Sequence, residues 1–394
     1  MYRSVQPSTS SDGVVLVTQK TPQIGRHSSM GDCSVAATVG VGMLKESQLN
    51  PDRVLGLFLG LAAGDRNGGP VQMALALAEA CCLHPPASTV SYDPSHVLQA
   101  YLEWWQGGHG VDAWDTGPVA GEVLRRVQQR ADTRQAEAIS RKLHIECGGM
   151  TAGVNALHRV APLAALFHSI PDDDLAALAW HESRLTHFSL ISQHACGIFV
   201  LLCRRLLLPS RREGTDIFQA SVESLTSHGG ARAYVVPEGM RACDRDSVES
   251  ALEGAACDSS LPLPDDLGCG GFCVEALRAA LHFVRTAVTF DDALQRSVEF
   301  AGPDNYCPVL VGALAGARFG ASQIDTSEGS KVLQHCRESI TERCRAVAAR
   351  CSNFSRVEMP TRLGSSRETL DAQDSDKKDS ACSAMLQTLH TSQA

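Results

Sequence analysis

The sequence predicts an all-α protein. Between residues 48 and 350, apolar residues recur at helical spacing in one segment after another, whereas only residues 14–17 and 233–236 resemble strands. Three helical segments also open on a Pro-Val pair, and proline suits the first turn because its φ matches a helix and its missing N–H would have no partner there. The three pairs are Pro70-Val71, Pro118-Val119 and Pro308-Val309.

Four helices are expected in the first part of this region. Residues 51–61 have a capped start and one apolar face, and residues 71–83 are apolar nearly all round, as in a helix buried on every side. Pro94 opens a helix over residues 96–106, and the second Pro-Val pair opens one over residues 119–130.

Four more helices are expected in the second part. Pro171 precedes three aspartates, which the helix dipole favours in a first turn. Residues 190–208 predict a buried helix and residues 273–288 an amphipathic one. In the last helix, 309–319, glycines recur every four residues, and since an interior glycine costs ~1 kcal/mol against alanine, a close helix or ligand contact is expected to compensate. Residues 229–267 fit no pattern and are expected to form an insertion loop with at most one helix.

Composition narrows the classes of function. A net charge of −9 argues against nucleic-acid binding, which requires a clustered Lys and Arg surface, so no nucleic-acid partner is expected. No apolar run reaches the ~18 residues of a membrane span, so no membrane contact is expected. The 15 cysteines show no zinc-finger spacing and are interpreted as reduced thiols, which predicts a cytoplasmic location.

The chain is expected to have three parts. Residues 1–47 are rich in Ser and Thr, show no sustained period and are interpreted as a flexible leader, with an organellar transit peptide as the alternative. Residues 48–350 form one domain, expected to be monomeric. Residues 351–394 hold too few large apolar residues to build a core and are interpreted as a disordered tail.

Small polar residues precede each Pro-Val helix start. Helix N-termini present unpaired N–H groups and the positive end of the dipole, so they bind anions. Three of them meeting in one cleft would suit a polyanionic, hydroxyl-rich ligand such as a nucleotide sugar, whereas the alternative is three ordinary capped helices. The polar residues are Asp65 and Asn67 at the first start, Asp115, Thr116 and Gly117 at the second, and Asp304 and Asn305 at the third.

A series of segments between Gly56 and Ser322 resembles, in order and spacing, the ADP-ribosylglycohydrolase family, which includes the dinitrogenase-reductase-activating glycohydrolases and the J1 crystallins. The resemblance implies a compact orthogonal helical bundle with a ligand cleft at residues 65–70, 115–118 and 304–308. The matching segments are Gly56–Asp65, Gln72–Ala80, Tyr101–Trp105, Asp115–Gly117, His158–Pro162, Glu182–His187, Gly271–Ala280 and Gly312–Gly320.

The resemblance also implies a function: hydrolysis of an ADP-ribosyl N- or O-glycosidic bond in an ADP-ribosylated protein or a small ADP-ribose derivative. Hydrolysing members hold two magnesium ions with a Thr-Asp-Asp-Thr cluster and a Gly-Gly-Asp-Thr-Asp-Thr segment. Here the first cluster is missing before Pro70, and the second reads Gly302-Pro303-Asp304-Asn305-Tyr306-Cys307. Because one carboxylate cannot hold two such ions, a dimagnesium centre is not expected, and at most one Mg²⁺ would bind at Asp304. The alternative function is therefore a catalytically inactive member that binds ADP-ribose or a related nucleotide, or a structural, crystallin-like protein.

The candidate catalytic residues are Asp115, Asp304 and His158. The resemblance places Asp115 at the substrate ribose, although an aspartate at a helix start can equally be a cap worth ~1 kcal/mol. Asp65, Asp115 and Asp304 are the carboxylates expected to converge, for acid/base chemistry or a single metal ion. His158 could carry a proton near neutral pH and pair with Asp304 if metal is absent.

The remaining candidates would bind substrate. Arg159 could grip a diphosphate through paired hydrogen bonds, or instead be a structural partner of nearby carboxylates. Phe272 could stack on an adenine or pack in the core. Cys307 is interpreted as a buried, inert thiol rather than a nucleophile. The other candidates for substrate contact are Asp65, Asn67, Thr116, Gly117, Asn155, Asn305 and Tyr306.

Overall fold

The chain divides into two compact units, Met1–Ala37 and Thr38–Ala394. The computed structural model describes residues of the second unit only, so the leader and the strand-like residues 14–17 lie outside the described residues. The described residues are 48–83, 89–107, 116–127, 131–209, 216–226, 236–256, 267–304, 306–325, 338–351, 353–354 and 356–358.

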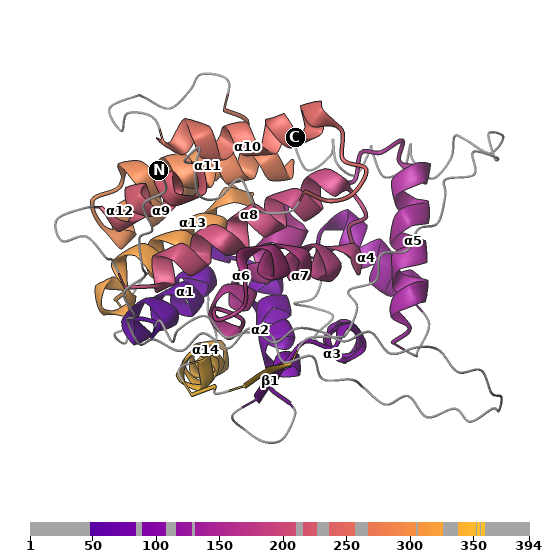
Figure 1. Cartoon of the computed structure of the whole chain (residues 1–394), viewed down its shortest axis with the longest axis horizontal. Coiled ribbons are helices and arrows are strands. Elements are labelled where there is room, and N and C mark those ends of the chain that lie inside the picture. The colour runs from indigo at the N-terminus through magenta and orange to yellow at the C-terminus, as the bar shows by residue number, and fades with distance from the viewer. Residues whose placement is uncertain are drawn as a thin grey trace, which may run out of the picture. The chain divides into compact units, whose positions relative to one another are not determined.

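The all-α prediction is confirmed, with fourteen α-helices in the described part of the chain (Figure 1). The first seven are α1 (Pro51–Gly64), α2 (Gly69–Cys81), α3 (Pro94–Gln106), α4 (Gly117–Arg126), α5 (Thr133–Glu146), α6 (Asn155–Leu166) and α7 (Asp172–Arg184). The others are α8 (Leu190–Leu207), α9 (Ile217–Thr226), α10 (Ala242–Ala256), α11 (Cys273–Thr286), α12 (Phe290–Ala301), α13 (Tyr306–Phe319) and α14 (Glu338–Cys351), with the short 3₁₀ helix η2 (Ala321–Gln323) after α13.

The helix starts at the three Pro-Val pairs are confirmed. Pro70 and Pro118 lie in the first turns of α2 and α4. Helix α13 begins three residues earlier than expected, at Tyr306, so that Pro308 still falls in its first turn. Within the insertion at 229–267, the described residues contain one helix, α10, which packs on α9 and α11 through buried residues such as Val248 and Leu252.

Helix α8 runs through the core. Its length and apolar composition would suit a membrane span, but most of it is buried inside the domain, which identifies it as a core helix. It packs against α6, α7, α11 and α13. The predicted burial of residues 190–208 is therefore confirmed by this packing.

Helices α1 and α13 lie side by side and antiparallel, with their backbones in direct contact (Figure 1). A methyl group at Gly60 would lie 2.1 Å from Gly312 O, and one at Gly316 would lie 1.9 Å from Gly56 O. Gly64 approaches Pro308 O in the same way. The close contact expected for the glycines of the last helix is thus a helix contact, not a ligand contact.

A small parallel sheet departs from the sequence prediction. Strand β1 (Thr89–Ser91) pairs with β2 (Arg356–Glu358) in the register Thr89↔Arg356, Val90↔Val357 and Ser91↔Glu358. Strands of three residues are too short to show an alternating pattern. Cys351 is the buried last residue of α14 and β2 reaches Glu358, so described structure extends past residue 350 into the segment 351–394 that is interpreted from sequence as a disordered tail.

This pairing predicts where the chain can be shortened. Removing residues 359–394 should leave the melting temperature within a few degrees of the full chain, whereas removing 354–394 should lower it clearly, because β1 then loses its partner strand. Differential scanning calorimetry of the two truncated proteins measures the difference. Equal melting temperatures would mean that the β1–β2 pair adds nothing to stability.

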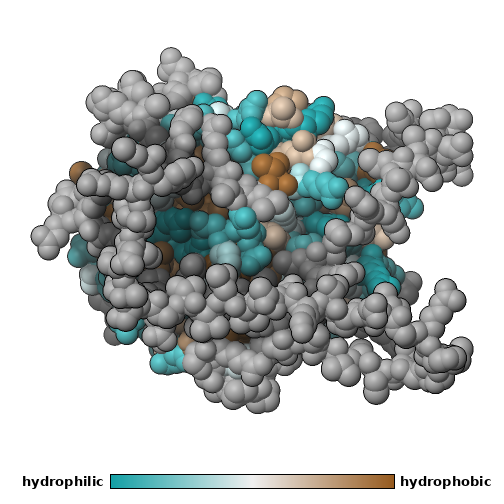
Figure 2. All heavy atoms as spheres, viewed as in Figure 1, coloured by the Kyte–Doolittle hydropathy of each residue, from teal (hydrophilic) through white to brown (hydrophobic). Residues whose placement is uncertain are grey.

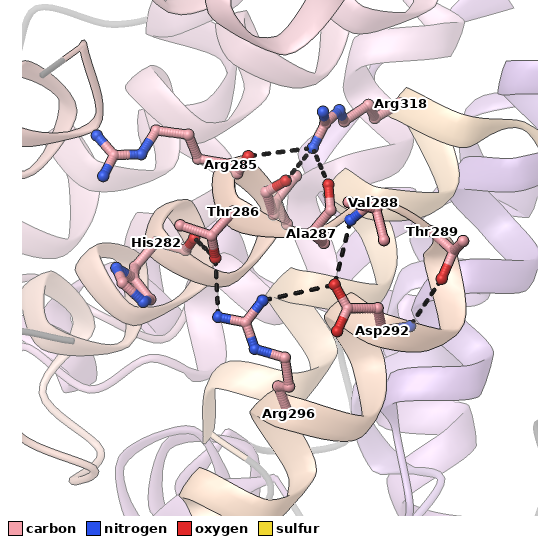
Figure 3. Close-up of polar contacts among 10 residues, drawn as sticks. His282, Arg285, Thr286, Ala287, Val288, Thr289, Asp292, Arg296 and Arg318 are labelled. Carbon is pink, nitrogen blue, oxygen red and sulfur yellow. Dashed lines mark hydrogen bonds and ion pairs between the residues drawn. The ribbon is translucent and has the colours of Figure 1, made fainter. Parts of the chain in front are cut away.

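The turn between α11 and α12 is held by side chains rather than by packing alone (Figure 3). Arg318, near the end of α13, donates to the carbonyl groups of Val284 and Ala287, at the last turn of α11. Arg296 donates to Thr286 Oγ1 at 2.9 Å, and the Asp292 N–H donates to Thr289 Oγ1 at 3.1 Å. A cation at a helix C-terminus interacts favourably with the dipole. This corner fixes one end of α11 and α12, and the opposite ends of both helices lead to the candidate site.

The described surface in Figure 2 is mostly hydrophilic, with small hydrophobic areas between polar ones. Single exposed apolar side chains are normal and need no partner to explain them. The large apolar residues exposed in the described part of the chain are Leu83, Ile145, Met150, Phe272 and Val288.

Candidate functional site

The first candidate helix end is closed by its own aspartate. Asp65 follows α1, is buried, and its Oδ1 accepts from the N–H groups of Asn67 at 3.1 Å and Gly68 at 2.8 Å. Its Oδ2 accepts from Val71 N at 2.7 Å. Asp65 therefore binds the two amides that precede α2 and one amide, that of Val71, in its first turn, which gives it a capping role at this helix start.

Arg66 connects this end with the third one. Its guanidinium donates to Gly302 O at 2.7 Å and to Asp304 O, both in the turn between α12 and α13. Asp304 is partly exposed beside this contact. Arg66 was not among the residues singled out from sequence, although its position directly after Asp65 put a cation next to the first expected helix start.

Helix α6 and the segment before α11 cover the start of α13. His158 is buried, and its Nε2 lies 2.7 Å from Tyr306 O. Gly271 packs on the ring of Tyr306, since a methyl group there would lie 2.9 Å from Tyr306 Cε1. Val154 N donates to Gly271 O at 3.0 Å, which joins the start of α6 to the same segment. Phe272 is 39% exposed next to this contact.

The second helix end joins the site through α6. Gly117 has φ +70°, and a methyl group there would lie 2.3 Å from Asn155 Oδ1, so only glycine fits this position. Thr116 is buried and its Oγ1 donates to Gly117 O at 3.2 Å. The backbone of α4 thereby approaches the amide of Asn155 at the start of α6.

The predicted site residues are thus partly gathered. The starts of α2 and α13 meet through Arg66, α6 joins α13 through His158, and α4 joins α6 through Asn155. Partly exposed at this junction are Asn67, Gly117, Asn155, Asp304 and Tyr306, with Phe272 more exposed. Asp115 and Asn305 lie outside the described residues, so the structure places neither of them.

Arg159 does not have the position expected of a diphosphate clamp. It is 0% exposed, and its Nε donates to Glu182 Oε1 at 2.6 Å. The same oxygen accepts from Tyr101 OH at 2.6 Å, and the guanidinium lies over the Tyr101 ring. The expected ligand contact is therefore replaced by the alternative, a structural ion pair. Arg159 points into the core, where it pairs with the buried carboxylate of Glu182 on α7.

Cys307 is buried in the first turn of α13, 3% exposed, with Sγ 3.8 Å from Ser297 O. Burial raises the pKa of this thiol to about 12. It therefore stays protonated at neutral pH, as the interpretation of an inert thiol requires.

The described residues do not fit a two-magnesium centre. They contain no group of three or more His, Cys, Asp or Glu side chains arranged to hold a metal ion. Both carboxylate oxygens of Asp65 accept backbone N–H groups, and the carbonyl oxygens of Gly302 and Asp304 accept from Arg66. These four oxygen atoms are thus already bonded to N–H donors of the protein, whereas magnesium needs several such oxygens around each ion.

Comparison with known proteins agrees with this architecture. A solved structure described as an ADP-ribosylglycohydrolase-related protein complex has the same fold, with a TM-score of 0.54, 22% sequence identity, and coverage of 77% of this chain and 98% of the other. No curated protein sequence matches significantly. The family model ADP-ribosylglycohydrolase matches residues 71–356, which is well over half of the chain. On this match, the chain belongs to the ADP-ribosylglycohydrolase family.

Proposed function

We propose that this protein binds ADP-ribose, free or attached to a protein, at the junction of α2, α4, α6 and α13, and that it does so without two-magnesium hydrolysis. The observation that carries the proposal is the use of Asp65 and Arg66. Asp65 accepts from the Asn67 and Gly68 amides before α2 with Oδ1 and from the Val71 amide in the first turn of α2 with Oδ2, and Arg66 donates to the carbonyl groups of the α12–α13 turn. Family membership supports the class of ligand, and the committed oxygens support the loss of the metal.

The residues at the junction suit the parts of such a ligand. The first turn of α13 offers the positive end of a helix dipole to a diphosphate. Asn155 and Asp304 are partly exposed side chains that can bond ribose hydroxyl groups. Phe272, exposed at the rim beside Gly271, offers an aromatic face on which adenine can stack.

Hydrolysis of an ADP-ribosyl N- or O-glycosidic bond is the second candidate function. It is favoured by the partial exposure of Asp304, which leaves a carboxylate at the junction within reach of water. A carboxylate can activate water as a general base. His158, expected as the partner of Asp304, instead has its Nε2 2.7 Å from Tyr306 O, so this nitrogen holds the helix start.

Calorimetric titration with ADP-ribose tests the binding proposal. Phe272→Ala should weaken binding by about tenfold to a hundredfold, since stacking on one base contributes ~1–3 kcal/mol. The control is Leu83→Ala, which removes another exposed apolar side chain at the opposite end of α2, about 20 Å from its start. Equal affinity in the parent and Phe272→Ala, or no binding by the parent, would contradict the proposal.

A second measurement separates binding from hydrolysis. Release of ADP-ribose from modified arginine and serine peptides should be absent with magnesium and with a chelator alike. Release that survives the chelator and disappears in Asp304→Asn would support the second candidate. Release that depends on magnesium would show that a metal centre forms although the Asp65 carboxylate and the Gly302 and Asp304 carbonyl groups already accept hydrogen bonds.

A further inference from the structure

Arg66 bridges two parts of the chain that are 236 residues apart in sequence. Its Nη1 donates to Gly302 O at 2.7 Å, and its Nη2 donates to Asp304 O. The base of the side chain is fixed as well, because Asp65 accepts from the next two backbone N–H groups, those of Asn67 and Gly68. The Arg66 side chain is therefore fixed at its backbone and at its guanidinium, and it cannot move away without breaking both guanidinium hydrogen bonds.

The charge of Arg66 suits this place. Gly302 directly follows the C-terminus of α12, where the dipole favours a cation. The turn itself is open: Gly302 has φ +62° and is exposed, and within the turn the Asp304 N–H donates to Ala301 O at 3.3 Å. The Gly302 N–H also donates to Val298 O at 3.0 Å, so the turn is tied to the end of α12, and the bonds from Arg66 tie it to the corner between α1 and α2.

A planar guanidinium fits the two carbonyl groups of this turn better than a lysine ammonium or a divalent metal ion would. Its fork donates in two directions at fixed angles, so it can bond two carbonyl groups that lie two residues apart. Lysine would offer a single point charge with mobile donors. A divalent ion would need several further ligands, and the described residues contain no group of three or more His, Cys, Asp or Glu side chains that could hold one.

We propose that Arg66 is a positioning residue of the binding site: its guanidinium is a built-in cation that holds the α12–α13 turn, and with it Asp304, against the corner between α1 and α2. On this proposal the site is ordered by the protein's own charge, where a metal ion would otherwise join the two segments. The inference rests on the proposed function for the ligand, but the structural link can be measured without any ligand.

Amide hydrogen exchange of the full-length protein tests the link. In Arg66→Ala, exchange at Gly302 and Asp304 should accelerate by about tenfold or more, while amides in the core of α8 keep the exchange rates of the parent. Arg66→Lys should fall between the two. The matched control is Arg125→Ala, which removes an arginine whose bonds to Glu122 lie on the surface. It should leave the exchange of both amides unchanged.

Calorimetric titration of the same variants tests the effect on the site. ADP-ribose should bind Arg66→Ala at least about tenfold more weakly than the parent, and millimolar guanidinium should restore part of the affinity by filling the vacated place. Magnesium in place of guanidinium should restore nothing. If Arg66 only stabilised the fold, the Arg66→Ala protein would be less stable than the parent, but added guanidinium would not restore its affinity for ADP-ribose.

The outcomes separate the two proposals. Unchanged exchange at Gly302 and Asp304 in Arg66→Ala would overturn the positioning role, whether or not ADP-ribose binds. Faster exchange in a protein whose parent form does not bind ADP-ribose would support the link and overturn the proposed function. Rescue by magnesium rather than guanidinium would overturn the idea of a built-in cation.

Discussion

Replacing Gly60 with alanine is expected to destabilise the domain by about 3 kcal/mol or more, because no space exists for the added methyl group. The methyl carbon would lie 2.1 Å from Gly312 O and 2.9 Å from Gly312 C, and both are backbone atoms of a buried helix. A side chain could turn aside, but two helix backbones must separate along their length. Urea denaturation followed by circular dichroism measures the loss.

The matched control is Gly254→Ala in α10. A methyl group there meets nothing within 4 Å, so the substitution should stabilise the protein by about 0.5–1 kcal/mol, through the better helix propensity of alanine. Equal stability of Gly60→Ala and the parent would show that α1 and α13 are less tightly packed than described.

The same glycine contact sets the geometry of the binding site. Gly64 ends α1 directly before Asp65 and touches Pro308 O in the first turn of α13. The starts of α2 and α13 are thus brought together by backbone packing as well as by Arg66. We expect Gly60→Ala protein to bind ADP-ribose more weakly than the parent, even under conditions where the helices of the variant are still formed.

Replacing Glu182 with alanine is expected to cost about 3–5 kcal/mol, since it leaves the charge of Arg159 buried without a partner. Arg159 and Glu182 are both 0% exposed. Burial by itself lowers the pKa of Arg159, but the adjacent Glu182 outweighs it and raises the pKa above its ordinary value, so the guanidinium stays charged. Tyr101 OH loses its acceptor in the same variant. Thermal and urea denaturation measure the effect.

Two comparisons make this prediction specific. Glu122→Ala, which breaks ion pairs with Arg125 and Arg126 near the surface, should cost only about 0–1 kcal/mol. The double variant Arg159→Met with Glu182→Leu removes both buried charges and should recover much of the stability lost in Glu182→Ala. A small loss in Glu182→Ala alone would mean that water reaches the pair.

Much of the fold could be predicted from the sequence, because helix starts are local. The Pro-Val pairs mark the starts of α2, α4 and α13 to within two or three residues, since the fixed φ of proline acts within one turn. The glycines of α13 likewise signalled a close contact. Whether that contact was a helix or a ligand depended on α1, which lies some 250 residues earlier in the chain, so spacing alone left both open.

The β1–β2 pair shows the opposite case. Its strands are three residues long and lie more than 260 residues apart. Strands this short carry no period, and their pairing depends on α2 and α14 bringing the two segments together, as the contact between these helices does. The sequence therefore assigned β2 to the tail.

The candidate site divides along the same line. The residue types at each helix start follow from the sequence, because capping needs Asp, Asn, Thr or Gly at fixed positions. The bonds of Asp65 are likewise local, because its acceptors reach amides no more than six residues ahead. The partners of the two arginines follow from the tertiary structure, which brings Arg66 to Gly302 and Asp304 and Arg159 to Glu182. A hydrogen bond or an ion pair acts over about 3 Å, and only the folded chain decides which distant groups come within that reach.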